Sequence, residues 1–387
     1  MSAGRPARWT RRHLELLADA AATTAPVIDP AAMPRILPDH DLWDLWPVQE
    51  EDGSTCVISG QELWMALSAP ILGHPEERHD RARIRLLAKD GDRWTDLGHA
   101  FADGASPGSR EWSGSAIRRP DDTVSVFYTA AGRRGETPPT FRQRVIEARP
   151  ALVADGRRIL LDPGAEHREL LRSDGRMYLP AEEITGAPGR IKAFRDPGWF
   201  RDPADGREYL LIAASVAEAG GFGGAIALAE ARDGAWSLLP PLIVAEGINH
   251  ELERPHVIVH RSRYYLFFST QRHNFHPADS APTGLYGFAA PSLTGPYEPL
   301  NGSGLVLRNP RAEPDQTYAW LVLPDLHVVG FANYRSFPGV DLRSAPAAQA
   351  RAGFGGTIAP ILKLTLNGME TAVVPAGTGL RHSAAGP

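Results

Sequence analysis

The sequence has 387 residues, of which 43% are hydrophobic and 22% charged, and its formal net charge is −5. This composition is that of a globular protein with a sizeable core, and its scattered Lys and Arg residues exclude a polybasic surface. The single cysteine, Cys56, excludes an internal disulfide and a zinc framework. From the scattered positive charge we predict no nucleic-acid partner and no membrane partner.

The N-terminal segment predicts one short helix followed by an extended approach to the main fold. Thr10 is a suitable N-cap for a helix over residues 11–22, and residues 23–39 are rich in proline. The segment begins with several arginines, but Glu15 and Asp19 interrupt the apolar run of an ordinary signal peptide. We expect a protein that is either cytoplasmic or exported by a non-standard route.

Short apolar runs separated by turns follow, and they predict strands. The chain has 38 Gly and 34 Pro, which suits many turns between short strands better than a helical bundle. Three segments share one form, a turn followed by an aromatic residue and a leucine, as outer strands of successive propeller blades would. We predict an all-β fold with three parts: residues 1–40 as the helix and approach segment, 41–375 as a single catalytic domain, and 376–387 as a flexible tail. The predicted strands lie at 55–58, 63–67, 83–87, 124–128, 209–212 and 264–268, and the three repeated segments at 92–97, 233–238 and 295–300.

The first candidate for chemistry is Asp44, which stands between Trp43 and Trp46. Two indoles would exclude water from a pocket wall, and burial makes a carboxylate more reactive. Pro47 argues against a helix interior and favours a strand end. The alternative is a turn aspartate beside core tryptophans, and this stretch alone does not decide between the two.

A second acid, Asp196, follows Arg195 and precedes a proline. The neighbouring cation would hold the carboxylate ionised, although Asp-Pro also favours an ordinary turn. The same pattern recurs at Asp202, where residues 204–206 continue as a turn sequence, and we interpret that copy as a structural hairpin.

The third acidic motif holds Glu251 and Glu253, which alternation places on one face of an extended strand. Two like charges on one face cost free energy unless one holds a proton or an arginine lies between them. A glutamate with a raised pKa is what a general acid near neutral pH requires. The alternative is a surface ion pair with Arg254.

Three separated acids at predicted strand ends indicate glycoside chemistry, which uses a carboxylate together with a carboxylic acid. His273 and His276 could be mistaken for a metal pair, but zinc sites use at least three protein ligands. We predict no metal site.

In their order along the chain, these motifs resemble glycoside hydrolase family 68, the group of levansucrases, inulosucrases and β-fructofuranosidases. The likeness extends over most of the chain, and its start is similar to the signal-less levansucrases of Gram-negative bacteria. The motifs are Trp43-Asp44-Leu45-Trp46-Pro47, Glu111-Trp112-Ser113-Gly114-Ser115-Ala116, Phe194-Arg195-Asp196-Pro197, Glu251-Leu252-Glu253-Arg254-Pro255-His256 and Gln316-Thr317-Tyr318.

The resemblance implies a five-bladed β-propeller with its site in a central funnel. It implies a retaining enzyme that cleaves sucrose through a covalent fructosyl-enzyme and passes fructose to sugar acceptors or water. Asp44 would be the nucleophile, Asp196 the transition-state stabiliser and Glu253 the acid and base. The implied substrate-binding residues are Trp43, Trp112 and Ser113 around the fructose, Arg195, Glu251 and Arg254 on sugar hydroxyls, Gln271 and Arg272 on the acceptor side, and Tyr318 against the nucleophile.

Two positions depart from the family pattern. His250 stands where Gram-positive members place a calcium-binding Asp, which argues against structural calcium, and no cofactor is predicted. Gln271 and Arg272 occupy the place of a His or Arg, which leaves acceptor choice open. The open alternatives are a mainly hydrolytic β-fructofuranosidase, another propeller glycosidase acting on fructans or arabinans, and a non-catalytic sugar-binding propeller.

Overall fold

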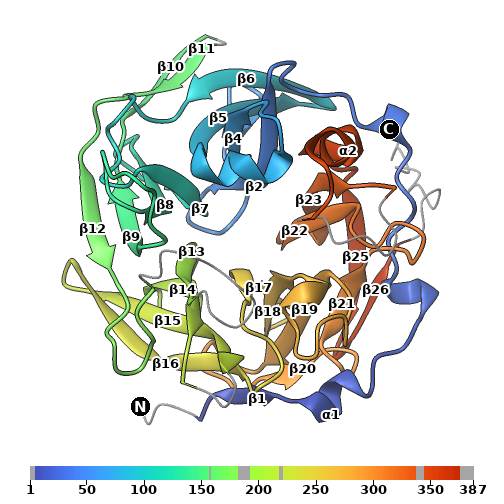
Figure 1. Ribbon diagram of the computed structural model, residues 1–387. Helices are drawn as coiled ribbons and strands as arrows, with labels where there is room; N and C mark the ends of the chain where they lie inside the picture. Colours follow the sequence, from blue (N-terminus) through green and yellow to red (C-terminus); the bar gives the residue numbers. More distant parts are fainter. Residues whose placement is uncertain (1–4, 157, 182–191, 218–220, 337–343, 375–387) are drawn as a thin grey trace, which may run out of the picture.

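The computed structural model describes residues 5–156, 158–181, 192–217, 221–336 and 344–374. Groups of β-strands lie side by side around a common centre, with strands β2, β7, β13, β17 and β22 innermost (Figure 1). Within each group the chain zigzags outward from the innermost strand through antiparallel neighbours. The fold is therefore all-β, as predicted.

The first two groups share one nine-stranded sheet, because β2 pairs in parallel with β7 at Val48–Gln49. The first consists of β2 (His40–Gln49), β3 (Val57–Ile58), β4 (Gln61–Pro70), β5 (Arg83–Asp90) and β6 (Arg93–His99). The second consists of β7 (Arg110–Arg118), β8 (Val124–Ala131), β9 (Gln143–Ala148) and β12 (His167–Leu171), and the separate hairpin β10 (Leu152–Asp155) and β11 (Arg158–Leu161) lies between β9 and β12 in sequence.

The remaining three groups are five-stranded sheets. The third consists of β13 (Phe194–Arg201), β14 (Glu208–Ser215), β15 (Gly224–Arg232), β16 (Ala235–Ala245) and the N-terminal β1 (Ala7–Trp9), which pairs in parallel with β16. The fourth consists of β17 (Glu253–His260), β18 (Arg263–Thr270), β19 (Gly284–Ala290), β20 (Glu298–Pro299) and β21 (Leu305–Arg308). The fifth consists of β22 (Thr317–Val322), β23 (His327–Tyr334), β24 (Phe354–Ile358), β25 (Leu362–Asn367) and β26 (Glu370–Val373).

The strand predictions are confirmed. The six apolar runs lie in or overlap β3, β4, β5, β8, β14 and β18, and all residues of β8 are buried, as expected for a strand packed on both faces. The three repeated segments overlap β6, β16 and β20, which lie toward the outer side of their sheets. The Asp202 turn joins β13 to β14, where Asp202 accepts from the amide of Ala204 at 2.9 Å.

The predicted helix over residues 11–22 is wrong in length. Helix α1 covers only Arg11–Leu14, and the single-turn 3₁₀-helix η1 (Ala21–Thr23) follows. The chain around η1 docks on the fourth group of strands, where Asp19, before η1, pairs with Arg308 at 3.2 Å and Ala25, after η1, donates to the Arg308 carbonyl at 2.8 Å. These tertiary contacts override the helical propensity of the segment. The other short helices are η2 (Pro30–Ala32), η3 (Pro75–Asp80), η5 (Arg272–Asn274) and α2 (Ala347–Gly353).

Each of the five innermost strands carries a β-bulge. The pairing register shifts between Trp43 and Trp46, Trp112 and Gly114, Arg195 and Gly198, Glu253 and His256, and Tyr318 and Leu321. At four of these bulges a residue other than glycine has left-handed backbone, with φ of 47° at Asp44, 57° at Asp196, 52° at Arg254 and 54° at Ala319. Bulges re-aim side chains and are frequent beside active sites.

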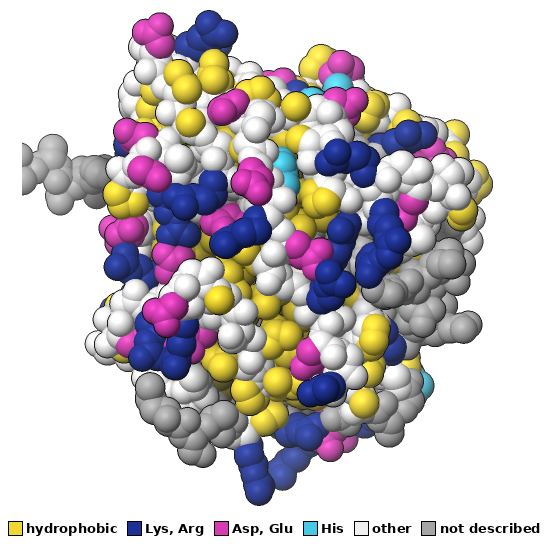
Figure 2. Space-filling model, turned by 90° about the vertical axis from the view of Figure 1, so that its left-hand side faces the viewer, with side chains coloured by type: hydrophobic (Ala, Val, Ile, Leu, Met, Phe, Trp, Pro, Cys, Tyr) yellow, Lys and Arg dark blue, Asp and Glu magenta, His cyan; other side chains and the backbone are white. Residues whose placement is uncertain are grey.

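The outer face shown in Figure 2 carries Lys and Arg side chains interspersed with Asp and Glu, as the scattered charge of the sequence predicts. Among the described residues, no helix is long and apolar enough to cross a membrane. The division of the chain at residue 40 stays a prediction, and the predicted tail, 376–387, lies outside the described residues.

Candidate active site

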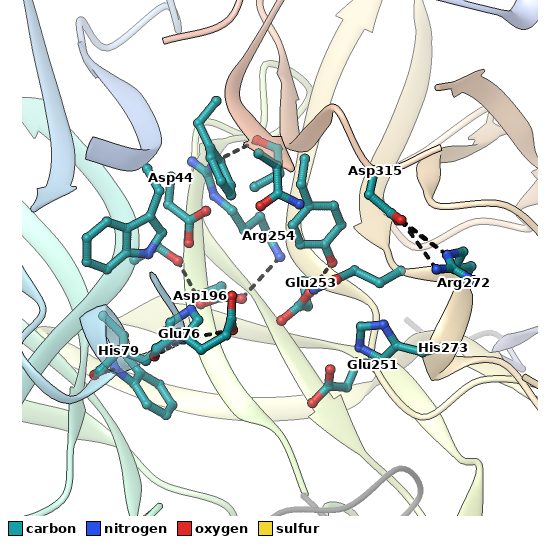
Figure 3. Close-up of a pocket in the computed structure, with 18 of the residues that line it drawn as sticks. Asp44, Glu76, His79, Asp196, Glu251, Glu253, Arg254, Arg272, His273 and Asp315 are labelled. Carbon is teal, nitrogen blue, oxygen red and sulfur yellow. Dashed lines mark hydrogen bonds and ion pairs between the residues drawn. The ribbon is translucent and has the colours of Figure 1, made fainter. Parts of the chain in front are cut away.

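A pocket of about 850 Å³ lies where the five innermost strands meet, and every residue predicted for the site lines it. Figure 3 shows Asp44, Asp196, Glu251 and Glu253 grouped in this pocket. The sequence-predicted lining residues are Trp43, Asp44, Trp112, Ser113, Arg195, Asp196, Glu251, Glu253, Arg254, Gln271, Arg272 and Tyr318.

Asp44 lies at the bulge of β2 and is half-buried in the pocket wall. Burial is the main cause that raises the pKa of Asp44 to about 6, with the Asp196 carboxylate adding to it and the charges of Arg254 and Arg78 opposing it. The carboxylate is therefore protonated in acid and ionised in neutral solution. Trp43 beside it is 2% exposed, so the indole wall expected from the sequence is present.

Asp196 lies at the bulge of β13 and is held by groups from neighbouring strands. Ser113 Oγ of β7 donates to Oδ1 at 2.8 Å, and the amide of Arg254 in β17 donates to Oδ2 at 3.3 Å. The backbone amide of Asp196 donates to Thr129 Oγ1 at 2.9 Å. The carboxylate is thus fixed in orientation by β7 and β17, and the backbone of Asp196 is held by β8.

Arg195 lies between the two glutamates, which is one of the two arrangements that the sequence analysis left open for two acids on one face. Its Nη2 lies 2.8 Å from Oε1 of Glu251 and 3.1 Å from Oε1 of Glu253. Although burial opposes it, the Arg195 charge lowers the pKa of Glu251, whose Oε2 also accepts from Asn274 Nδ2 at 2.8 Å. Burial and the Glu251 charge raise the pKa of Glu253 well above its ordinary value. Glu251 is the anion of this pair and Glu253 the protonated acid.

Tyr318 was predicted to lie against the nucleophile, but its hydroxyl donates to Oε2 of Glu253. Burial is the main cause that raises the pKa of the phenol well above its ordinary value, so it remains a donor. Tyr318 lies at the bulge of β22, beside β17, and this position brings its hydroxyl to Glu253. The hydrogen bond therefore orients the acid.

Two predicted sugar-binding arginines have other partners. The guanidinium of Arg254 donates to the carbonyls of Leu45 at 2.8 Å and Ala319 at 2.9 Å, which links the innermost strands of the first and fifth sheets. Arg272 lies 2.6 Å from Asp279 and 3.4 Å from Asp315 (Figure 3). Arg254 therefore positions the backbone beside Asp44, and Arg272 belongs to an ion-pair cluster on the pocket wall.

The sequence analysis missed the turn η3, which contributes Glu76, Arg78 and His79 to the pocket. Arg78 Nη1 donates to Oε1 of Glu76 at 2.8 Å, and its guanidinium lies 5.4 Å from the Trp43 ring centre. Tyr334 of β23 donates to the same Glu76 oxygen at 2.7 Å. The signal in the sequence was a cluster of charged residues directly after Pro75. Such a cluster predicts an exposed turn, and the sequence alone does not show that the turn packs against the pocket.

The residues present do not fit a calcium site at His250. Its Nδ1 lies 3.0 Å from the Asn274 carbonyl, and burial lowers the pKa of the imidazole. Calcium takes oxygen ligands, whereas the nearby Glu251 oxygens are bound by Arg195 and Asn274. Within the described ranges no three His, Cys, Asp or Glu side chains gather in a way that could hold a metal ion. His276 stacks on Phe222 at 4.5 Å.

An ionised aspartate and a protonated glutamate in a pocket walled by indoles define a glycoside-processing enzyme of the acid-and-nucleophile type. The sequence model of Levansucrase/Invertase, glycoside hydrolase family 68, matches residues 1–224 and 218–378. The chain belongs to this family.

Curated relatives match nearly the whole chain. It is 31% identical to a levansucrase of Erwinia amylovora, over 96% of this chain and 94% of that protein. It is 32% identical to a levansucrase of Zymomonas mobilis, over 95% of this chain and 90% of that protein. Among solved structures, it is similar to an inulosucrase from Halalkalicoccus jeotgali bound to kestose, at 39% identity, a TM-score of 0.88 and coverage of 96% of this chain and 95% of that one. A levansucrase from Gluconacetobacter diazotrophicus matches at 26% identity and a TM-score of 0.79, over 95% of this chain and 90% of that one.

Proposed function

We propose that this protein cleaves sucrose by double displacement and transfers the fructosyl group to sugars or water, on a five-bladed β-propeller. Each of the five strand groups would be one blade, and the pocket would be the central funnel. The observation that carries the activity is the difference between Asp44, ionised above about pH 6, and Glu253, which stays protonated near neutral pH, in one pocket. Membership of family 68 supports the same activity.

In the first half-reaction, Asp44 attacks the anomeric carbon of the fructosyl group. The bond from this carbon to the glucosyl oxygen breaks, and the proton of Glu253 passes to that oxygen, so that glucose leaves. Asp196 supplies a fixed negative charge that stabilises the positive charge developing on the sugar ring. The product of this half-reaction is a covalent fructosyl-enzyme.

In the second half-reaction, the Glu253 carboxylate takes a proton from water or from a sugar hydroxyl. The oxygen attacks the same carbon and Asp44 leaves as a carboxylate, so two inversions give overall retention. Arg195 and Tyr318 hold Glu253 in place for both transfers.

Substrate recognition would combine apolar ring contacts with charged hydrogen bonds. Trp43 and Trp112 suit the apolar faces of a sugar ring, and Arg195 with Glu251 suits its hydroxyls. Gln271 and Arg272 would lie on the acceptor side. The inulosucrase that resembles this chain was solved with kestose bound, which supports sugar substrates or acceptors for this chain as well.

A time course on sucrose, with free glucose and free fructose assayed separately, tests the proposal. Glucose in excess over fructose would show transfer, and equal amounts would make the protein a β-fructofuranosidase that mainly hydrolyses. Absence of glucose would refute sucrose as the substrate, and fructans and arabinans would then be assayed.

A further inference from the structure

The turn η3 brings one unassigned residue, His79, into contact with both indoles of the predicted fructose subsite. The His79 ring meets the Trp43 ring edge-on, with 6.0 Å between centres and 85° between planes. The carbonyl of the same residue accepts from Trp112 Nε1 at 3.2 Å. Figure 3 shows His79 on the wall of the pocket opposite Arg272. The residue thus lies beside both apolar contacts of the expected fructosyl group.

The hydrogen bonds of His79 fix its tautomer. Its Nδ1 lies 3.1 Å from the carbonyl of Glu76, and a carbonyl oxygen can only accept. Nδ1 therefore carries the proton, and Nε2 of the neutral ring has a free lone pair. No group of the described residues forms a hydrogen bond with Nε2, and 44% of the side chain is exposed in this pocket-lining position.

The charge state of the ring keeps this lone pair available. The ring is exposed only toward the pocket, and its enclosure there together with the Arg78 charge lowers the pKa of His79 to about 4. The imidazole is consequently neutral throughout the range in which Asp44 is ionised. A neutral acceptor also adds no negative charge to a pocket already lined by several carboxylates, so it does not raise the pKa of Asp44 further.

From this geometry we propose that His79 is a specificity-determining residue whose Nε2 accepts a hydrogen bond from a hydroxyl of the bound fructosyl group. The inference rests on the proposed function, because it assumes that the sugar ring bound beside Trp43 and Trp112 is the fructosyl group. A sugar hydroxyl is the donor that such a lone pair needs, since the neighbouring carboxylates only accept.

Two amide substitutions test the roles of the two ring nitrogens of His79 separately. His79→Asn retains a donor near the Nδ1 position for the Glu76 carbonyl and removes the acceptor, whereas His79→Gln can place its Oε1 near the position of Nε2. Glu77→Gln is the matched control, because Glu77 is exposed in the same turn and does not line the pocket. Glucose release from sucrose and thermal unfolding would be measured for all variants.

We expect His79→Asn to lower kcat/KM for sucrose by about 10-fold with little change in Tm, as for loss of one substrate hydrogen bond, and His79→Gln to recover most of that loss. Wild-type kcat/KM in His79→Asn, or equal losses in both variants, would overturn the proposal. A change confined to the ratio of transfer to hydrolysis would also overturn it, because it would place the contact on the acceptor. Failure of the wild-type protein to release glucose would instead refute the proposed function itself.

Discussion

Removing the charge of Glu251 should move the pH dependence of the enzyme toward acid. Nη2 of Arg195 lies 2.8 Å from one glutamate oxygen and 3.1 Å from the other, so the two oxygens are at most about 5.9 Å apart. At that distance and an effective dielectric constant of about 20, two unit charges repel by about 2.8 kcal/mol. This corresponds to about two pH units in the titration of Glu253.

The sign follows from the role of Glu253 as an acid. Burial and the Glu251 charge raise its pKa, and activity is lost when pH rises through that pKa. In Glu251→Gln the repulsion disappears while the Arg195 cation remains, so the pKa of Glu253 falls. The basic limb of kcat/KM against pH should therefore move down by about two pH units.

Initial rates of glucose release at low sucrose concentration, over a range of buffers, give this profile. Asp279→Asn is the control, since it also removes one carboxylate from the pocket wall, but one that is 59% exposed and paired with Arg272. Its basic limb should stay near that of the wild type. An unmoved or alkaline-shifted limb in Glu251→Gln would refute the assignment of Glu251 as the charge that keeps Glu253 protonated.

Further predictions concern the nucleophile, the acid and the link between sheets. Asp44→Asn should lower kcat on sucrose by roughly 10⁴-fold, and a wild-type rate would refute its role. Because burial raises the folded-state pKa of Asp44 from 3.8 to about 6, its charge destabilises the fold increasingly between these pH values and fully above about pH 6. The same variant should thus raise Tm at about pH 7 and leave it unchanged at about pH 3.5, in thermal unfolding. Glu253→Gln should lose less activity on a fructoside with a good leaving group than on sucrose, and equal losses would reduce Glu253 to a binding residue. Arg254→Met should lower the free energy of unfolding by about 3 kcal/mol in urea titrations, because two buried carbonyls lose their donor; a loss under about 1 kcal/mol would contradict that link.

The acids of the site were predictable because their neighbours in sequence are also their neighbours in space. Trp43 and Asp44 share one strand, as do Glu253 and Arg254, so local pattern and strand alternation carried the information. The cost of two like charges on one face indicated that a proton or an arginine must accompany the two glutamates, but it did not identify Arg195 as that arginine. The all-β fold likewise followed from short apolar runs between turns.

What remained hidden depends on contacts between distant segments. The turn that holds Arg78 and His79 reads as exposed, and only its docking against Trp43 and Trp112 brings it into the pocket. The two carbonyls that bind Arg254 belong to residues 45 and 319, a juxtaposition created by the meeting of the first and last sheets. The helix after Thr10 was overestimated for the same reason, since Asp19 is drawn to Arg308.

The left-handed backbone at two of the bulges explains which kind of acid stands at each position. Among residues other than glycine, aspartate and asparagine adopt positive φ most readily, because their short side chains bond locally to the backbone. Asp44 and Asp196 have φ of 47° and 57°, whereas Glu253 precedes such a residue, Arg254. Lengthening either aspartate to glutamate would therefore strain the main chain as well as displace the carboxylate, while the longer acid is free to occupy position 253. Asparagine tolerates the same backbone, so amide variants remove the carboxylate without straining the main chain, whereas alanine variants add backbone strain.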